Sequence, residues 1–204
     1  MPTTWPRHSL SKDRLRTIAI IGAGPLGRWL ALAAARAGFR VLLEDVMPAS
    51  LHHAQEYIRQ QLSPAALGSD QPQVAFVSSI EDAVREADLV IDCVPDELES
   101  KLEILWLLDR MAPPRTVIAT PTTRLSIADL AACTYRADKC VAIVAEAREL
   151  ASGLASEILL RTTARTSAES IELVRGFWEQ LGFKPRFEVE NEETASVESA
   201  RSAT

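Results

Sequence analysis

Hydrophobic residues occur along this chain in short runs separated by longer amphipathic segments. The runs Thr17–Ile21, Arg40–Leu43 and Asp88–Val94 are largely apolar, as in strands that are buried on both faces. Between the first two, Pro25–Ala37 is rich in alanine and leucine and is followed by Gly38, a residue type that commonly ends helices. The pattern therefore predicts strands that alternate with helices.

The remainder of the chain continues this alternation. Further strands are predicted at Val74–Val77, Thr116–Ala119, Lys139–Val144, Glu157–Leu160 and Phe187–Val189, and further helices at Ala49–Leu62, Ile80–Glu86, Glu97–Met111, Ser126–Ala132 and Ala168–Leu181. Ser126, with Asp129 three positions later, has the form of a helix N-cap. Strands alternating with helices indicate an α/β fold in which helices cover both faces of a mainly parallel, doubly wound sheet.

The predicted elements lie within residues 15–190, which we expect to form a single domain, because 204 residues suffice for one hydrophobic core. Residues 1–14 and 191–204 lack such a pattern, and we expect a flexible N-terminal segment and a polar tail there. The N-terminal residues lack the apolar centre of a signal peptide, and no run is long enough to span a bilayer. We therefore expect a cytoplasmic protein.

Composition and charge narrow the range of partners. The net charge is -6 and the isoelectric point is about 5.2, so the chain lacks the excess of basic residues that nucleic acids or anionic membranes attract. The three cysteines, Cys93, Cys133 and Cys140, show no metal-binding spacing, and we expect no metal site. Unpaired thiols are typical of a reducing compartment.

The stretch Ile18–Gly27, IAIIGAGPLG, joins a predicted strand to a predicted helix with the spacing Gly-x-Gly-x-x-Gly. In this motif Gly22 permits a tight turn, Gly24 lets a pyrophosphate approach the backbone, and Gly27 lets the helix pack on the strand. The free N–H groups at the start of the helix attract phosphates. The pattern predicts a Rossmann-like dinucleotide site, and the alternative is a turn kept only for packing. The predicted cofactor-binding residues here are Gly22, Gly24, Pro25, Leu26 and Gly27.

An acidic residue follows the second strand at the position that such a site requires. Asp45 lies eighteen positions beyond Gly27, where a carboxylate accepts hydrogen bonds from the adenosine ribose and repels a 2′-phosphate. Glu44 is a candidate helper. Val46–Ser50 contains no arginine or lysine that could bind that phosphate, so NAD is favoured over NADP. The alternative is that Asp45 only ends the strand.

Two later stretches, ADLVIDCVPDELESKLEIL and VIATPTTRLSIADLA, carry a more specific resemblance. Together with the glycine turn and Asp45, they resemble the NAD-binding domain of the L-3-hydroxyacyl-CoA dehydrogenase family, over about Leu15 to Val189. The resemblance implies an oxidoreductase-like protein of fatty acid metabolism with NAD as cofactor.

The resemblance also implies roles for individual residues. Cys93 takes the place of a small residue near the adenine-side ribose, Asp96 replaces a glutamate, and Lys101 matches a lysine that contacts the cofactor. Thr123 replaces a serine beside the nicotinamide and the substrate, and Pro121 replaces an asparagine. An alternative stays open for each pair of residues. Asp96 and Lys101 could form a solvated charge pair, and the threonines at 122 and 123 could only cap or end a strand.

The catalytic residues of the family are not retained. Its next strand leads into His-Phe-x-Asn-Pro, whose histidine accepts the hydroxyl proton, and a glutamate about a dozen residues later orients that histidine. Here Val144 occupies the histidine position and Ala147 the asparagine position, and Glu157 matches the glutamate only after a shift of one residue. We therefore predict no catalytic residue and regard Thr123 and Glu157 as possible remnants.

Substitutes for the missing base are few. The three histidines are His8, His52 and His53, and none occurs after residue 53. A carboxylate with a raised pKa could act instead, and the candidates are Glu146, Glu149, Glu157 and, as a phenol, Tyr135. In the family a helical C-terminal domain covers the cleft and binds the acyl-CoA, and from the resemblance we expect this chain to lack that domain.

Three functions are compatible with these features. The first is an NAD(H)-binding module without competent 3-hydroxyacyl-CoA oxidation. The second is an active NAD-dependent oxidoreductase on another hydroxy substrate, with a non-histidine base or a partner subunit. The third is a structural subunit without nucleotide. The substrate and pathway are not predicted.

The helix predicted at Glu97–Met111 carries more apolar residues than one helix face needs. Either the core buries them all, or they dock a second copy or a partner subunit on the surface that the family's C-terminal domain covers. The residues are Leu98, Leu102, Leu105, Trp106 and Leu108.

Overall fold

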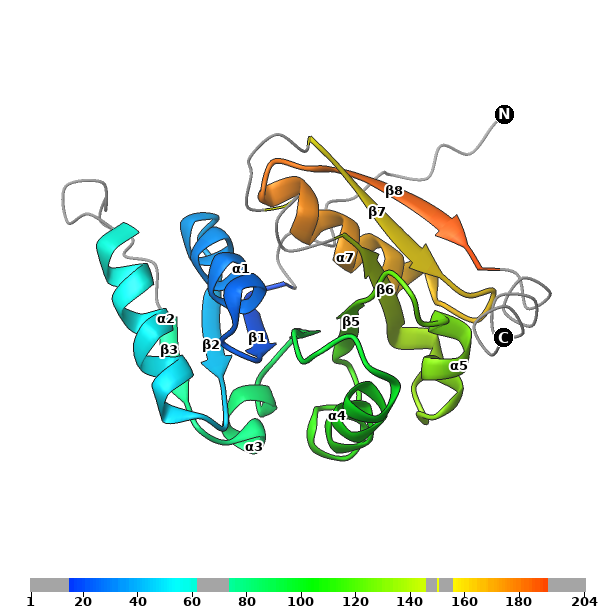
Figure 1. The fold of residues 1–204 in the computed structure, drawn as a ribbon. Coiled ribbons are helices and arrows are strands. Elements are labelled where there is room, and N and C mark those ends of the chain that lie inside the picture. The colour runs from blue at the N-terminus through cyan, green and yellow to red at the C-terminus, as the bar shows by residue number, and fades with distance from the viewer. Residues whose placement is uncertain (1–14, 62–73, 146–149, 151–155, 191–204) are drawn as a thin grey trace, which may run out of the picture.

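Eight strands form one sheet in the order β3-β2-β1-β4-β5-β6-β7-β8 (Figure 1). This computed structural model describes residues 15–61, 74–145, 150 and 156–190. The strands are β1 (Thr17–Ile21), β2 (Arg40–Glu44), β3 (Val74–Val77), β4 (Leu89–Asp92), β5 (Val117–Pro121), β6 (Cys140–Val144), β7 (Glu157–Thr162) and β8 (Lys184–Val189). All neighbours are parallel except β6 and β7, so the predicted mainly parallel sheet is confirmed.

Helices cover both faces of this sheet, as the alternating pattern predicts. The helices are α1 (Pro25–Arg36), α2 (Pro48–Gln61), α3 (Ile80–Val84), α4 (Leu98–Met111), α5 (Ile127–Ala132), the short 3-10 helix η2 (Ala137–Lys139) and α7 (Ala168–Gln180). Apolar residues of α1, α2 and α7 pack in one cluster, and those of α3 and α4 pack in another. None of the described helices is long and apolar enough to cross a membrane.

Alternation along β1 shows why both faces need a cover. Ile18 and Ile20 belong to the cluster under α1, α2 and α7, whereas Ala19 and Ile21 belong to the cluster under α3 and α4. All four are fully or almost fully buried, because successive strand residues point to opposite faces of the sheet. The doubly wound Rossmann-like α/β fold predicted from the sequence is therefore confirmed.

The last strand is longer than predicted. β8 begins at Lys184, three residues before the predicted start at Phe187. It is an edge strand whose residues are mostly exposed, so its hydrophobic pattern is weak, and Pro185 is tolerated because an edge strand needs fewer ladder hydrogen bonds.

The strand order places the loops of interest together. The chain runs outward through β1, β2 and β3 and then crosses back to β4 on the other side of β1. In open α/β sheets, ligands bind beyond the carboxyl ends of the strands at such a reversal. The loops after β1, β2, β4, β5 and β6 all begin at this edge.

Candidate functional site

The turn after β1 is built from backbone contacts among three strands. The Gly22 N–H donates to the Glu44 carbonyl oxygen at 2.8 Å, and the Cys93 N–H donates to the Ile21 carbonyl oxygen at 2.7 Å. Gly22 has φ +100°, and a Cβ there would lie 3.0 Å from the Cys93 carbonyl oxygen. A Cβ on Gly27 would lie only 1.8 Å from the Gly22 carbonyl oxygen. Both glycines are therefore required by the turn itself.

Gly24 lies in a different environment. A Cβ at this position would meet nothing within 4 Å, and its φ of −64° is open to any residue. It is the N-cap of α1, where no side chain caps the helix, and Pro25 follows in the first turn. The start of α1 thus offers N–H groups and a positive dipole end to a ligand, as an anion-binding helix does.

Asp45 closes the turn from the end of β2. Its Oδ2 accepts the Ala23 N–H at 2.8 Å, and its Oδ1 accepts the Met47 N–H at 2.8 Å. Each carboxylate oxygen has lone pairs left for a ligand hydroxyl. The structure thus brings Asp45 against the glycine turn, where the sequence predicts a ribose partner.

Glu44 does not share this position. Its side chain is 5% exposed and lies on the sheet face of α3 and α4, in one row with Ile21 and Val77 of the neighbouring strands. Burial, followed by the nearby charge of Asp45, raises the pKa of Glu44 to about 7. The interpretation of Glu44 as a helper at the ribose is therefore wrong for its side chain, and only its carbonyl oxygen contacts the turn.

Lys101 is enclosed by the protein. Its side chain is fully buried, and its Nζ donates to Asp92 Oδ2 and to the Asp92 carbonyl oxygen, both at 3.2 Å. Asp92 also accepts the Thr120 hydroxyl at 2.9 Å and the Val94 N–H at 3.1 Å. Burial raises the pKa of Asp92, and the lysine charge and these hydrogen bonds oppose that rise.

This geometry corrects the interpretation of Lys101 as half of a solvated charge pair. The lysine pairs with Asp92 and not with Asp96, and the pair is not solvated. Lys101 is fully buried in this structure, and its contact with the cofactor stays a prediction. Its bonds to Asp92 hold the end of β4 and the loop that follows.

Asp96 joins the loops after β4 and β5. Its Oδ2 accepts the Thr123 N–H at 3.1 Å, and its carbonyl oxygen accepts Arg124 Nη2 at 2.8 Å. Its Oδ1 is buried and has no hydrogen-bond partner among the described residues. A buried carboxylate oxygen without a donor indicates a place for a donor from a ligand or a water molecule.

Thr122 and Thr123 have different roles. Thr122 is buried, and its hydroxyl oxygen accepts the Leu125 N–H at 2.9 Å and the Arg124 N–H at 3.3 Å, so it caps the turn after β5 as the structural alternative predicts. Thr123 is exposed beside Asp96.

Cys93 is half-buried against the core, and burial raises the pKa of its thiol well above the usual range.

The position expected for a general base holds an apolar side chain. Val144 is half-buried at the end of β6, opposite Leu159 of β7. Pro121 pairs with Ile143 at the end of β5 and provides neither a side-chain amide nor an N–H. Glu157 is exposed at the start of β7.

The other candidate bases do not approach this position. Tyr135 is fully exposed near η2, and His52 and His53 are exposed on α2. Glu146, Ala147, Glu149 and His8 lie outside the described residues. Within the described part of the chain, no three possible metal ligands cluster as a metal site would need.

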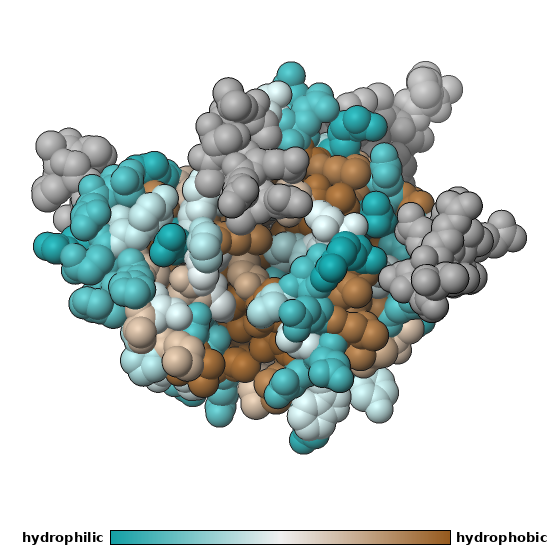
Figure 2. Space-filling view, viewed as in Figure 1, coloured by the Kyte–Doolittle hydropathy of each residue, from teal (hydrophilic) through white to brown (hydrophobic). Residues whose placement is uncertain are grey.

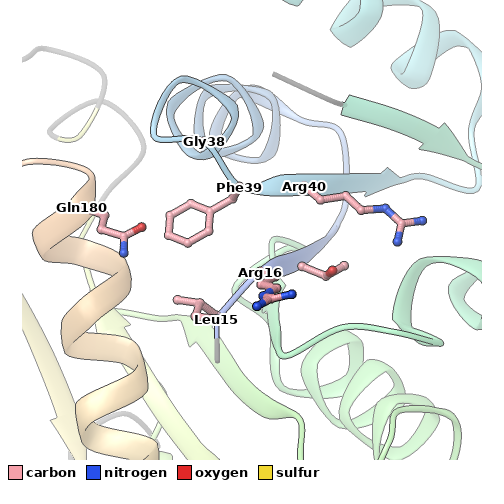
Figure 3. Close-up of a pocket in the computed structure, with 7 residues that line it drawn as sticks. Leu15, Arg16, Gly38, Phe39, Arg40 and Gln180 are labelled. Carbon is pink, nitrogen blue, oxygen red and sulfur yellow. The ribbon is translucent and has the colours of Figure 1, made fainter. Parts of the chain in front are cut away.

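A separate pocket lies at the opposite end of the strands. Leu15, Arg16, Thr17, Gly38, Phe39, Arg40 and Gln180 line it (Figure 3). These residues precede or begin β1 and β2, or end α7, and none belongs to the glycine turn. Because ligands of open α/β sheets bind at the carboxyl ends of the strands, this pocket is not the cofactor site.

The sequence alone did not identify Asp92, Thr120 or Arg124 as part of this edge. Asp92 could have been found, since it is a buried acid at the end of an otherwise apolar strand and only a buried cation or several donors make such a position stable. Thr120 and Arg124 give no comparable sequence signal, because their partners come from another loop.

Comparisons with known proteins agree with this geometry. Residues 17–145 match the family model of the 3-hydroxyacyl-CoA dehydrogenase NAD-binding domain. A probable 3-hydroxybutyryl-CoA dehydrogenase of Bacillus subtilis is 31% identical over 135 residues, which are 62% of this chain and 47% of that protein. An L-carnitine dehydrogenase of a Pseudomonas species is 28% identical over 188 residues, 84% of this chain and 54% of that protein.

Solved structures show the same relationship. The (S)-3-hydroxybutyryl-CoA dehydrogenase of Ralstonia eutropha has a TM-score of 0.77 and 25% identity, over 87% of this chain and 64% of that chain. The chain spans about half the length of the curated relatives it matches. These comparisons confirm the resemblance seen in the sequence and NAD as the cofactor of this kind of domain.

Proposed function

This chain belongs to the NAD-binding-domain family of the 3-hydroxyacyl-CoA dehydrogenases, and from this premise we propose that it binds NAD(H) without oxidising 3-hydroxyacyl-CoA on its own. The observation that carries the proposal is a complete nucleotide turn beside an apolar residue, Val144, where the family has its base. Binding and proton transfer are therefore separated in this chain.

The residues present fit a dinucleotide. The open space at Gly24 and the uncapped start of α1 suit the pyrophosphate, and Asp45 suits the adenosine ribose. The unpartnered Oδ1 of Asp96 and the exposed Thr123 suit donors and acceptors of the nicotinamide half. Bound NAD supplies a hydride acceptor.

The same residues do not supply a base. A valine cannot accept a proton, and Pro121 offers no amide beside it. Glu157 lies on the surface, where water solvates its carboxylate. General base catalysis alone typically contributes about 10²- to 10⁴-fold in rate, so its loss lowers turnover by about that factor.

The test is a binding measurement and an activity assay on the same preparation. Calorimetric titration with NADH first establishes that the site is filled. NADH formation is then followed with NAD and L-3-hydroxybutyryl-CoA, and we expect no rate above the blank. Turnover of the unmodified chain at an ordinary enzyme rate would contradict the proposal, and absence of NADH binding would contradict its first part.

A matched pair of variants makes the assay sharper. Val144→His restores the side chain that the family uses, and Val144→Leu is the control of similar burial. We expect little gain from Val144→His, because Pro121 still lacks the amide of the family's asparagine. A large gain in Val144→His alone would show that the base was the only function lost.

A further inference from the structure

Helix α4 carries an unusual share of the exposed apolar surface in the described part of the chain. Leu98, Trp106 and Met111 are exposed to 52%, 55% and 43%, whereas Leu105 and Leu108 of the same helix are buried in the core. Core packing therefore explains only part of the apolar content of α4. In Figure 1 its outer side is not covered by another helix or strand, and in Figure 2 the surface there mixes hydrophobic and hydrophilic side chains.

Charged residues on α4 are ordered along the same outer side. Glu99, Glu103, Trp106 and Arg110 are all exposed and follow each other at spacings of four, three and four, so they form one line along the helix. We call these four residues the α4 stripe. The acids lie in its N-terminal half and the cation in its C-terminal half.

Arg110 is held in place within the α4 stripe. Its guanidinium lies 4.7 Å from the centre of the Trp106 ring. Such a stacked guanidinium keeps its hydrogen-bonding edge open for a carboxylate. Because stacking already restricts the side chain, binding costs it less conformational entropy. Trp106 and Arg110 are also residue types enriched at the centres of protein interfaces.

The α4 stripe is complementary to itself when one copy is reversed. Glu99 and Arg110 lie at equal distances from the helix midpoint, between Ile104 and Leu105, and so do Glu103 and Trp106. In an antiparallel pair, Glu99 of each copy faces Arg110 of the other, which gives two symmetric contacts. A parallel pair would place like charges together.

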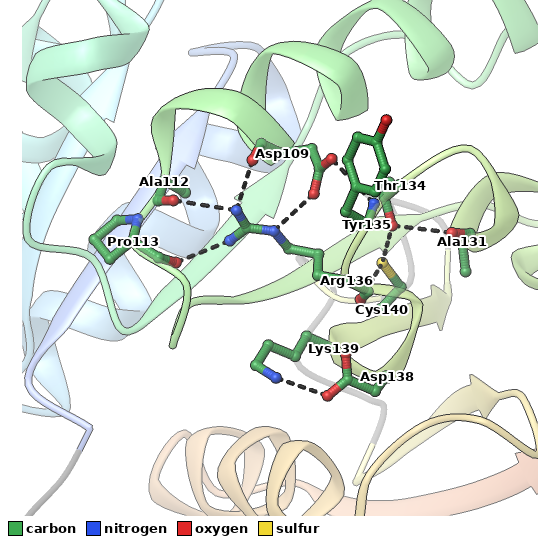
Figure 4. A network of polar contacts seen from close by, with 10 residues as sticks. All are labelled: Asp109, Ala112, Pro113, Ala131, Thr134, Tyr135, Arg136, Asp138, Lys139 and Cys140. Carbon is green, nitrogen blue, oxygen red and sulfur yellow. Dashed lines mark hydrogen bonds and ion pairs between the residues drawn. The ribbon is translucent and has the colours of Figure 1, made fainter.

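Hydrogen bonds keep the end of α4 rigid. Arg136 donates to the carbonyl oxygens of Asp109, Ala112 and Pro113 and to Asp109 Oδ1, and the Tyr135 N–H donates to Asp109 Oδ2 (Figure 4). The fully exposed Tyr135 is thereby held beside the C-terminal end of α4.

We propose that a second copy of this chain docks on the α4 stripe, with the two α4 helices antiparallel about a two-fold axis. Leu98 and Leu102 flank the stripe on one side, and Leu107 and Met111 flank it on the other. One pair of helices makes an interface at the low end of the usual size range, below about 1,200 Å², so the dimer is weak and reversible.

Sedimentation velocity over a concentration series tests this dimer with the full chain. The wild type shifts from monomer to dimer as its concentration rises. Glu99→Arg and Arg110→Glu each place like charges at both symmetric contacts and raise the dimer dissociation constant roughly tenfold or more. Glu179→Arg, an exposed substitution on α7, is the control and leaves it unchanged.

Restoring complementarity distinguishes this interface from any other. An equimolar mixture of the Glu99→Arg and Arg110→Glu proteins forms a heterodimer, because the facing positions 99 and 110 then carry two cations in one copy and two anions in the other. The chain with both substitutions regains the homodimer. A monomer at every concentration overturns the proposal. A dimer insensitive to the reversals, or reversals that the mixture does not rescue, overturns it equally and indicates another surface or another partner.

Discussion

Gly27 packs on Gly22 so closely that a Cβ atom at Gly27 would lie 1.8 Å from the Gly22 carbonyl oxygen. Helix α1 is thereby fixed directly on the turn that ends β1. Gly24, between the two, has nothing within 4 Å of its would-be Cβ. The same residue type thus shapes the turn at two positions and leaves space for a ligand at the third.

These environments predict opposite effects of the same substitution. Gly27→Ala forces the backbone of the turn apart and lowers the free energy of unfolding by about 2 kcal/mol or more. Gly24→Ala leaves that free energy within about 1 kcal/mol of wild type, because its φ of −64° suits alanine, but it weakens NADH binding. Urea denaturation and NADH titration measure the two quantities. The assignment fails if Gly24→Ala unfolds the protein or Gly27→Ala leaves it unchanged.

The buried pair of Lys101 and Asp92 predicts a large cost for removing one partner. Lys101→Met leaves a buried carboxylate without its cation and destabilises the fold by about 3–5 kcal/mol. Adding Asp92→Asn removes the unpaired charge and keeps an acceptor for Val94, so most of the loss is recovered. Chemical denaturation of both variants measures these changes in the free energy of unfolding. If the double variant is no more stable than Lys101→Met, the cation has a different role.

Glu44 predicts a pH dependence of stability. Because its pKa in the folded state is about 7, above its ordinary value of 4.5, the folded protein binds the proton more tightly than the unfolded chain does. The stabilising contribution of protonated Glu44 to the free energy of unfolding is fully present below pH 4.5. It is lost as the pH rises to about 7, and the free energy of unfolding falls by up to about 3 kcal/mol.

Glu44→Gln removes this titration. The variant gains stability relative to wild type between pH 5 and pH 8, and the two proteins have similar free energies of unfolding near pH 4. Urea denaturation across that range measures the difference, and Glu81→Gln, an exposed change on α3, is the control. A constant difference at all pH values would contradict the burial of an uncompensated acid.

The sequence was sufficient where one local pattern determines the structure. The apolar runs around Ile18 and Ile91 could only be buried strands, and the turn from Gly22 to Gly27 requires glycines for backbone reasons alone. Asp45 could be placed because its distance from the turn is fixed by one helix and one strand.

The sequence was insufficient where partners come from distant segments. The pairing of Lys101 with Asp92 depends on how α4 begins over β4, and the nearer acid in the sequence, Asp96, instead binds the loop after β5. Glu44 follows the strand alternation to the buried face, although its position next to Asp45 suggested a shared role. Such contacts are set by packing, and hydrophobic periodicity does not report them.

The central claim, an NAD site formed by the glycine turn and Asp45, is tested most directly by titrating the protein with NADH and with NADPH in the same calorimeter. We expect tighter binding of NADH. Asp45→Ala should weaken the binding free energy of NADH by about 1.5–3 kcal/mol, roughly ten- to a hundredfold in affinity. It should also narrow the preference for NADH over NADPH, because the carboxylate no longer repels the 2′-phosphate. Equal affinity of the wild type for the two nucleotides, or binding of neither, would contradict the account.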